Sequence, residues 1–159
     1  MKALSNGIAT VEKYVAMCIM LAMAILIIVS VLFRYVFNAP LSWAGEVSVF
    51  LLVWTSFIGG SLGLKYRSQA AVTIALDYMP ERGKKVIGMI GHVLMLLFLL
   101  LLLYYSYTWV FSPAVSFQKS TALLLPMWIP FSAVPISLTC AAVHITCNLM
   151  EMIRGEEAA

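Results

Sequence analysis

Four long apolar segments, separated by short polar breaks, set the pattern of this sequence. Within each segment nonpolar side chains follow one another without the alternation of a half-buried strand, as in residues 93–103, and such runs are typical of helices surrounded by lipid. A helix rises 1.5 Å per residue, so about 20 residues cross the roughly 30 Å hydrocarbon core of a bilayer. The pattern predicts membrane-spanning helices over residues 14–33, 43–64, 86–111 and 126–150.

The polar breaks contain signals for turns and helix ends. Between the first two segments, a turn at residues 38–40 precedes Ser42, which suits the N-cap of the second helix. The longest connection, residues 65–85, contains a half-apolar stretch over 70–79. We expect this stretch to form a short helix at the membrane surface. Pro135 lies inside the fourth segment and predicts a kink there.

The N-terminal residues 1–13 have a mildly amphipathic pattern. Ile8, Val11 and Val15 share one helical face, while Glu12 belongs to the polar side. We expect this segment to lie on the membrane surface and to continue into the first span. The first apolar segment is too long for the hydrophobic region of a typical signal peptide, and no small-residue cleavage site follows it. We therefore interpret it as an uncleaved first span.

The composition supports the same class of protein. Of the 159 residues, 63% are hydrophobic and only 11% are charged, whereas ordinary globular proteins are about 25% charged. We predict an all-α, polytopic membrane protein that forms a single domain over residues 1–159. The three cysteines lie in apolar segments without a CxxC motif, so neither a disulfide framework nor a metal site is indicated. The small net charge of +3 does not point to nucleic acid.

Lysine and arginine residues cluster on one side of the predicted topology. Eight of the ten lie in the N-terminal segment, the connection over 65–85 and the C-terminal tail, and only Arg34 and Lys119 lie on the other side. Because short cytoplasmic segments carry the excess of positive charge, we expect both termini in the cytoplasm. The breaks at 33–42 and 112–125 then face outward, towards the periplasm in a Gram-negative bacterium.

Ionisable side chains that could serve catalysis or ion transport are scarce within the predicted spans. Arg34 ends the first span and Glu46 opens the second, so the hairpin could join them as an ion pair. His92 and His144 lie at similar depths, and two histidines on facing helices can hold a haem. A haem-binding subunit that uses these histidines, or a small autonomous exporter that uses Glu46, is therefore an alternative to a protein without such chemistry.

Small residues on the second span are more informative. Gly59 and Gly63 have the GxxxG spacing, which allows two membrane helices to approach closely. This face fits either packing inside the bundle or contact with a larger membrane partner. The sequence contains no catalytic constellation, nucleotide-binding loop or charged pathway. These observations favour an accessory or scaffold subunit and not an enzyme.

The stretch FRYVFNAPLSWAGE, residues 33–46, adds a family resemblance. It is similar to the signature of the small four-span subunit of tripartite ATP-independent periplasmic (TRAP) transporters, with an arginine, an aromatic-Asn turn and a tryptophan before an acidic pair. Gly45 replaces the first acid of that pair, and Gln69 and Ala71 stand where the next loop of the family has glycine and histidine. The matching positions are Arg34, Phe37, Asn38, Trp43, Glu46, Trp54, residues 57–60, Arg67, residues 77–80, residues 125–130 with Trp128, and Pro135.

The resemblance implies an accessory or scaffold subunit of a sodium-coupled importer of organic acids, such as a C4-dicarboxylate, a sialic acid or another sugar acid. The implied partners are a large multi-span transport subunit in the bacterial inner membrane, a periplasmic substrate-binding protein and membrane lipids. No cofactor, metal or catalytic residue is implied. The candidate structural and interaction residues are Arg34, Asn38, Trp43, Glu46, Gly59, Gly63, Arg67 and Trp128.

Overall fold

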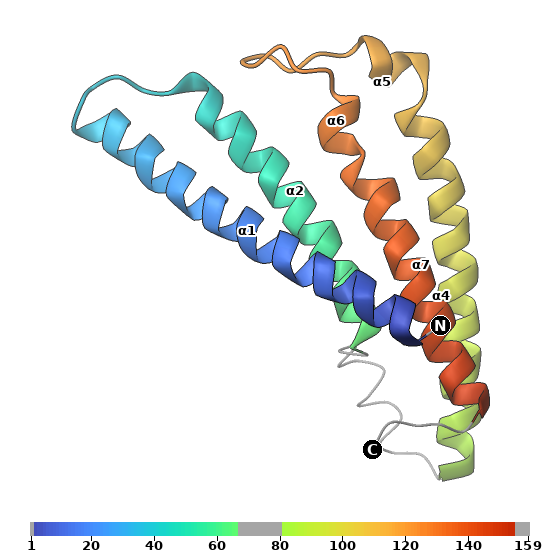
Figure 1. Cartoon of the computed structure of the whole chain (residues 1–159). Coiled ribbons are helices and arrows are strands. Elements are labelled where there is room, and N and C mark those ends of the chain that lie inside the picture. The colour runs from blue at the N-terminus through green and yellow to red at the C-terminus, as the bar shows by residue number, and fades with distance from the viewer. Residues whose placement is uncertain (1, 67–80, 155–159) are drawn as a thin grey trace.

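The computed structural model describes residues 2–66 and 81–154, and it consists of long helices (Figure 1). Four of its helices are long and apolar enough to cross a membrane, over Lys2–Tyr35, Ser42–Lys65, Ile87–Val110 and Trp128–Arg154. The prediction of an all-α protein with four membrane-spanning helices is therefore confirmed. The surface helix expected over residues 70–79 lies outside the described residues.

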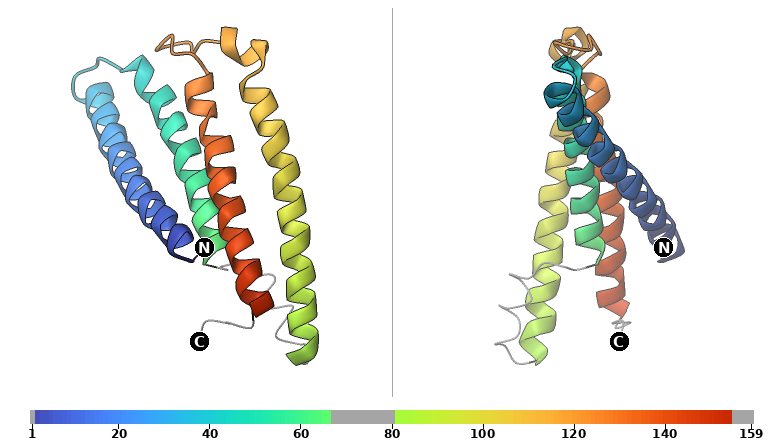
Figure 2. Two further views of the ribbon diagram at one scale, coloured as in Figure 1. Left: turned by 45° about the vertical axis from the view of Figure 1, so that its right-hand side comes forward. Right: turned by 90° about the vertical axis from the view of Figure 1, so that its left-hand side faces the viewer.

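The long helices form a layer that is one helix thick (Figure 2). Its members lie in the order α1, α2, α7, α4, so that α7 packs between α2 and α4, and α1 packs mainly on α2. Two short helices, α5 and α6, belong to the connection between α4 and α7. The helices are α1 (Lys2–Tyr35), α2 (Ser42–Lys65), α4 (Glu81–Val110), α5 (Pro113–Phe117), α6 (Trp128–Phe131) and α7 (Ala133–Arg154).

The first helix has its polar face turned towards the protein. Ser5, Ala9 and Glu12 are buried, whereas Val11, which belongs to the expected apolar face, is 63% exposed. The segment continues into the first span as expected, but Glu12, which we placed on the polar side of a segment at the membrane surface, is buried against the other helices. Lipid tails are as apolar as leucine, so an apolar side chain gains little by turning inward, while a polar group gains a partner there.

Two helix boundaries differ from the predicted ones. Ser42 is the first residue of α2, Leu41 occupies the cap position, and no side chain caps the helix. The fourth span is interrupted at Ser132, between α6 and α7, and Pro135 lies in the first turn of α7. Proline has no N–H and its ring excludes the carbonyl of Phe131, four residues earlier. The interruption therefore falls just before the position where the kink was expected.

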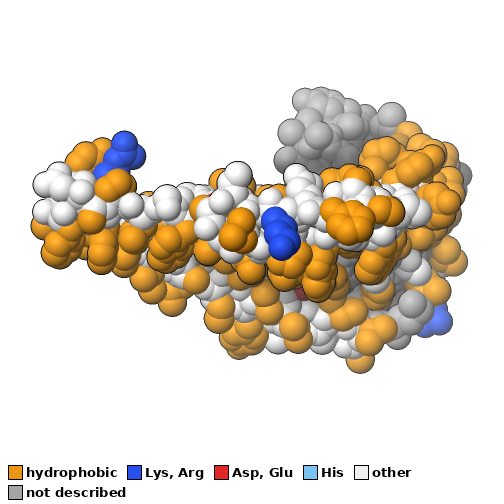
Figure 3. Space-filling view, turned by 90° about the horizontal axis from the view of Figure 1, so that it is seen from above, with side chains coloured by type: hydrophobic (Ala, Val, Ile, Leu, Met, Phe, Trp, Pro, Cys, Tyr) orange, Lys and Arg blue, Asp and Glu red, His pale blue; other side chains and the backbone are white. Residues whose placement is uncertain are grey.

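A small core lies around the middle of α7. Leu99 of α4 packs against Ala141 and Ile145 of α7, and these are 6%, 2% and 1% exposed. Most other large apolar side chains point outward, and Figure 3 shows hydrophobic side chains over much of the visible surface. The layer therefore presents apolar surface to its surroundings on more than one side.

The two ends of the layer are distinct. Lys2 Nζ is 4.0 Å from Glu151 Oε1, so the beginning of α1 and the last turns of α7 share one end. The connection between α1 and α2 lies at the opposite end, together with α5 and α6 (Figure 1). Four spans bring the chain back to the end of the layer at which it began, which accounts for this arrangement.

Candidate functional site

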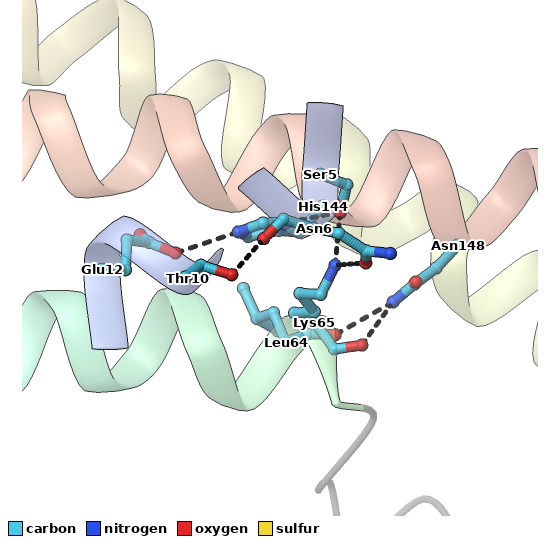
Figure 4. A network of polar contacts seen from close by, with 8 residues as sticks. All are labelled: Ser5, Asn6, Thr10, Glu12, Leu64, Lys65, His144 and Asn148. Atoms are coloured by element: carbon cyan, nitrogen blue, oxygen red, sulfur yellow. Dashed lines mark hydrogen bonds and ion pairs between the residues drawn. The ribbon is translucent and has the colours of Figure 1, made fainter. Parts of the chain in front are cut away.

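A cluster of polar side chains joins α1, α2 and α7 near the end at which α1 begins (Figure 4). At its centre lies His144 of α7, whose side chain is 0% exposed. Its Nε2 atom is 2.9 Å from Glu12 Oε2, and its Nδ1 atom is 2.8 Å from Ser5 Oγ. Both partners belong to α1 and are themselves buried. Both ring nitrogens of His144 are therefore engaged within the chain.

The direction of two hydrogen bonds in this cluster follows from Lys65, whose ammonium group can only donate. Lys65 Nζ lies 2.8 Å from Ser5 Oγ and 2.7 Å from Asn6 Oδ1, and an ammonium group accepts no hydrogen bond. Ser5 Oγ thus accepts from Lys65, and its bond with His144 Nδ1 runs in the direction that the histidine tautomer sets. At the other side of the ring, a carboxylate can only accept, so His144 Nε2 donates to Glu12 Oε2. A chain of hydrogen bonds thus links the Lys65 ammonium to the Glu12 carboxylate through Ser5 and His144.

The end of α2 is held at the same place. Asn148 Nδ2 donates to the carbonyl oxygens of Leu64, at 3.1 Å, and Lys65, at 3.2 Å. The last carbonyl groups of a helix lack partners within that helix, so these bonds also satisfy the terminus of α2. We refer to the side chains that link the three helices as the His144 cluster: Ser5, Asn6, Glu12, Lys65, His144 and Asn148.

The chemistry of the His144 cluster suits attachment of a helix. It contains one ammonium and one carboxylate, so their charges compensate, and burial strengthens the attraction between them. Ionisable groups in membrane helices are costly unless they are paired. Since α1 contacts α7 at few other points, the cluster is its principal polar connection to the centre of the layer.

The sequence interpretation missed this cluster because it assigned Glu12 to the polar, outward side of a surface helix. A signal was present: Ser5, Ala9 and Glu12 recur at spacings of four and three residues, which places them on one helical face. In a membrane protein such a small and polar face is the one expected to turn inward. The distant partners, Lys65 and His144, had no such local signal.

The two histidines do not form a joint site. His92 Nδ1 is 2.9 Å from the carbonyl oxygen of Gly88, one turn earlier in α4, while His144 uses both ring nitrogens as described above. Haem ligation by His144 would require one of its buried hydrogen bonds to break. Among the described residues, no group of three or more His, Cys, Asp or Glu side chains could hold a metal ion.

A second polar cluster lies at the opposite end of the layer, where Glu46 of α2 holds the loop that precedes α6. Its Oε1 atom accepts hydrogen bonds from the backbone N–H of Thr121, at 2.8 Å, and from the Thr121 hydroxyl, at 3.0 Å. Its Oε2 atom accepts from the N–H groups of Ala122 and Leu123, both at 3.1 Å. One carboxylate thus binds three consecutive backbone N–H groups. Leu124, the next residue, has a positive φ of 54°.

The expected ion pair between Arg34 and Glu46 is wrong. Glu46 gives both of its oxygens to the 121–123 backbone, and the ion pairs found among the described residues do not include one with Arg34. The Arg34 guanidinium lies instead 5.8 Å from the ring centroid of its neighbour Tyr35. Converging backbone N–H groups provide the more complete set of partners for a carboxylate because each supplies a directed donor.

Replacing Glu46 by alanine should release the loop over residues 120–125. Trypsin should then cut after Lys119 several times faster than in the unmodified protein, because local opening exposes the backbone. Glu46→Gln keeps acceptor oxygen but loses the charge and should give an intermediate rate. Limited proteolysis followed by mass spectrometry measures these rates.

Arg34→Ala is the matched control and should leave cleavage at Lys119 unchanged. The effects of Arg34→Ala and Glu46→Ala on stability should also add in the double variant, as they do for residues that share no partner. Cleavage of Glu46→Ala at the unmodified rate, or protection that depends on Arg34, would contradict the role assigned to Glu46.

The other candidate residues that the structure describes lie outside these two polar clusters. Asn38 has a φ of 49° in the turn between α1 and α2, a conformation that asparagine tolerates better than most residues. Trp43 and Trp128, at the starts of α2 and α6, are 39% and 47% exposed. A Cβ atom added at Gly59 would meet nothing within 4 Å, whereas Gly63 is half-buried. Arg67 lies outside the described residues.

Gly59 therefore does not serve close packing inside this chain, which was one of its two expected roles. Its neighbour Gly60 is also open on its outer side, with nothing within 4 Å of an added Cβ. By contrast, a Cβ at Gly88 of α4 would lie 3.1 Å from Cε of Met152 in α7. Close approach of α4 and α7 thus involves Gly88, while the outer face of α2 is left without a contact in this chain at Gly59.

The sequence matches the model of a known protein family over residues 23–155. The description of that family is tripartite ATP-independent periplasmic transporters, DctQ component. The match begins in the middle of α1 and covers all of α2, α4, α5, α6 and α7.

Three named relatives are similar over nearly the whole chain. The C4-dicarboxylate TRAP transporter small permease protein DctQ of Vibrio cholerae is 26% identical, with 94% of this chain and 77% of the relative aligned. A putative TRAP transporter small permease protein of Haemophilus influenzae is 28% identical, with 96% and 88% aligned. The isethionate TRAP transporter permease protein DctMQ of Oleidesulfovibrio alaskensis is 28% identical, and 92% of this chain aligns with only 24% of it.

Proposed function

Because this chain belongs to the DctQ component family of the TRAP transporters, we propose that it is the scaffold subunit on which the large transport subunit assembles. The chain is a TRAP transporter small permease, a multi-pass protein of the bacterial inner membrane and not an enzyme. The finer proposal is that it supports sodium-coupled import of an organic acid without forming the transport pathway itself.

The observation that carries this proposal is that the carboxylates of Glu12 and Glu46 both hold other parts of the chain in place. Glu12 binds His144, and Glu46 binds the loop over residues 121–123. A carrier needs an ionisable group that can exchange its partner for an ion or a substrate, but both of these groups hold helices or loops together. The small-exporter alternative, which relied on Glu46, is therefore less well supported than the scaffold.

The shape of the chain supports contact with a large membrane partner. A layer one helix thick leaves α1 without a buried residue in its most apolar stretch, and α2 with few. The DctMQ relative aligns with this chain over only 24% of its length, so its small-permease part shares a polypeptide with a much larger remainder. We propose that the present chain meets the corresponding large permease as a separate subunit.

The outer face of α2 is the proposed contact. Gly59 and Gly60 are exposed and have open space beside them, and small residues let a second helix approach closely. A partner helix on this face would be adjacent to Leu52, which is 52% exposed. Contact with a larger membrane partner is the second of the two roles that we considered for the GxxxG motif; the first was packing inside the bundle.

The orientation of the chain in the membrane is also part of the proposal. The excess of lysine and arginine favours the cytoplasm for the end that carries Lys2 and Arg154. The loop held by Glu46 would then face the periplasm, on the side from which a periplasmic substrate-binding protein approaches. The substrate classes we propose are C4-dicarboxylates, sialic acids and other sugar acids.

Purification of the tagged chain from its native membrane tests the scaffold role. We expect a larger multi-span permease to co-purify in equimolar amount in mild detergent, and a high-salt wash should not remove it because the proposed contact is apolar. A tagged, unrelated four-span protein from the same membrane serves as the control. Recovery of this chain alone, from membranes that contain the large permease, would contradict the proposal.

A further inference from the structure

The chain between α5 and α6 forms a short hairpin over residues 118–127 (Figure 1). The backbone N–H of Ser120 donates to the carbonyl of Leu125, at 2.8 Å, and a second backbone bond, at 2.9 Å, joins the two ends of the hairpin. The Leu125 N–H also donates to the Ser120 hydroxyl, at 3.3 Å. The two arms therefore hold each other through bonds to which α2 contributes nothing. We call the residues between the arms, 121–124, the hairpin tip.

The hairpin tip directs three consecutive backbone donors to one place. The N–H groups of Thr121, Ala122 and Leu123 all donate to the carboxylate of Glu46. Leu124 follows them with its positive φ of 54°, a conformation that is uncommon for a residue with a side chain. Successive N–H groups in a turn form a concavity that binds anions. In this structure the anion is a side chain of the same chain.

The donors of the hairpin tip divide into two sets, one for each oxygen of the anion. Thr121 gives its N–H and its hydroxyl to Oε1 of Glu46, at 2.8 and 3.0 Å. Ala122 and Leu123 give their N–H groups to Oε2, both at 3.1 Å. A single spherical ion such as chloride has no second centre for the second set. The arrangement therefore suits a carboxylate, as do the backbone concavities that capture the C-terminus of a peptide.

The hairpin tip is reachable from the aqueous side. Thr121 and Ala122 are exposed, and Glu46 is only half-buried. The tip also lies between two of the candidate spans, which end at Val110 and begin at Trp128. An anion that is dissolved in water can therefore reach the tip without entering lipid.

We propose that the hairpin tip is a carboxylate-binding site in its own right, for which Glu46 is the tethered ligand. The donors of the tip recognise the carboxylate group and not the helix that carries it. The site therefore takes the carboxylate of a small organic acid from solution when the Glu46 side chain is absent. In the unmodified protein the tether gives Glu46 a high effective concentration, so a free acid competes poorly.

Titration of the Glu46→Ala variant with acetate tests this site in the full chain. Alanine removes the tethered carboxylate and leaves room for a free one. By NMR of isotope-labelled protein in micelles, we expect the amide resonances of Thr121, Ala122 and Leu123 to move towards their unmodified positions and to saturate. Sodium chloride at the same ionic strength should not move them, and neither should acetamide, which has the shape of acetate without its charge.

Protection of the hairpin from trypsin provides a second measurement. Saturating acetate should return cleavage of Glu46→Ala after Lys119 to the rate of the unmodified protein in the same acetate. Glu46→Gln is the matched control: its side chain has the same size and fills the tip, so acetate should change neither its resonances nor its cleavage. Adding Thr121→Val to Glu46→Ala removes the hydroxyl donor and should weaken acetate binding about tenfold.

Tip resonances of Glu46→Ala that do not respond to acetate, or that respond equally to chloride, would overturn the site. An equal response of Glu46→Gln would also overturn it, because acetate would then act elsewhere on the chain. Glu46→Ser, which also empties the tip, should behave like Glu46→Ala. Neither measurement requires the large transport subunit, so failure of this site is distinguishable from failure of the scaffold proposal.

Discussion

Replacing His144 by alanine is expected to destabilise the helix layer by about 3–5 kcal/mol, as does the removal of one partner from other buried charged pairs. The variant would leave the Glu12 carboxylate without its bond from Nε2, which is 2.9 Å long in the structure. Ser5 would lose its hydrogen-bond partner at Nδ1 at the same time. Equilibrium unfolding in mixed micelles, followed by circular dichroism, measures this loss.

Two further variants decide whether the pair itself is responsible. Replacing both Glu12 and His144 by leucine should recover most of the loss, because two apolar groups leave no buried charge uncompensated. His92→Ala is the matched control: within the described part of the chain, this histidine is bonded to a carbonyl of its own helix, so we expect a loss of about 1 kcal/mol or less. Losses that add in the Glu12/His144 double variant would contradict the coupling.

The second large effect concerns assembly. Gly59→Leu should reduce co-purification of the large transport subunit by at least about tenfold, which corresponds to about 1.4 kcal/mol of binding free energy. A leucine side chain on this face would hold a partner helix away from α2, yet its Cβ would have no atom of the other described helices within 4 Å. The folding of the subunit should therefore be unaffected, and its unfolding midpoint checks this.

Gly91→Leu is the control for this variant, because that glycine also has open space beside it but lies on α4. We expect it to retain the large subunit. If Gly91→Leu loses the partner while Gly59→Leu retains it, the contact lies on the α4 side of the layer and our assignment of the α2 face is wrong.

The four spans could be predicted from the sequence because lipid imposes one simple requirement. A segment of about 20 apolar residues must cross the core as a helix, since its backbone has no other source of hydrogen bonds there. That requirement fixes the class and the number of spans. It does not fix which side of a helix faces the protein, because apolar side chains are equally well placed against lipid or against another helix.

Glu12 illustrates what was missed for this reason. The amphipathic pattern placed this residue on the polar side of a segment at the membrane surface, but it is buried with Ser5 against α7. In a bilayer the polar groups carry the information about packing, because only they gain strongly from meeting one another. Their partners on α2 and α7 are distant in sequence and could not be inferred from a local pattern.

Glu46 illustrates a second limit. The hairpin logic that paired it with Arg34 considered side-chain charges alone, whereas its actual donors are mainly the backbone N–H groups of Thr121, Ala122 and Leu123. Every residue except proline has such a group, so the sequence contains no mark that distinguishes these three. The family signature identified Glu46 as a candidate position without revealing its partner.

Reconstitution into liposomes tests the central claim most directly. Vesicles would contain this chain alone, or this chain with its large transport subunit, and would receive the periplasmic binding protein, an imposed sodium gradient and labelled C4-dicarboxylates, sialic acid or isethionate. We predict no uptake with this chain alone, and uptake dependent on the binding protein when both subunits are present. Accumulation of any of these substrates by vesicles that contain only this chain would contradict its role as a scaffold subunit.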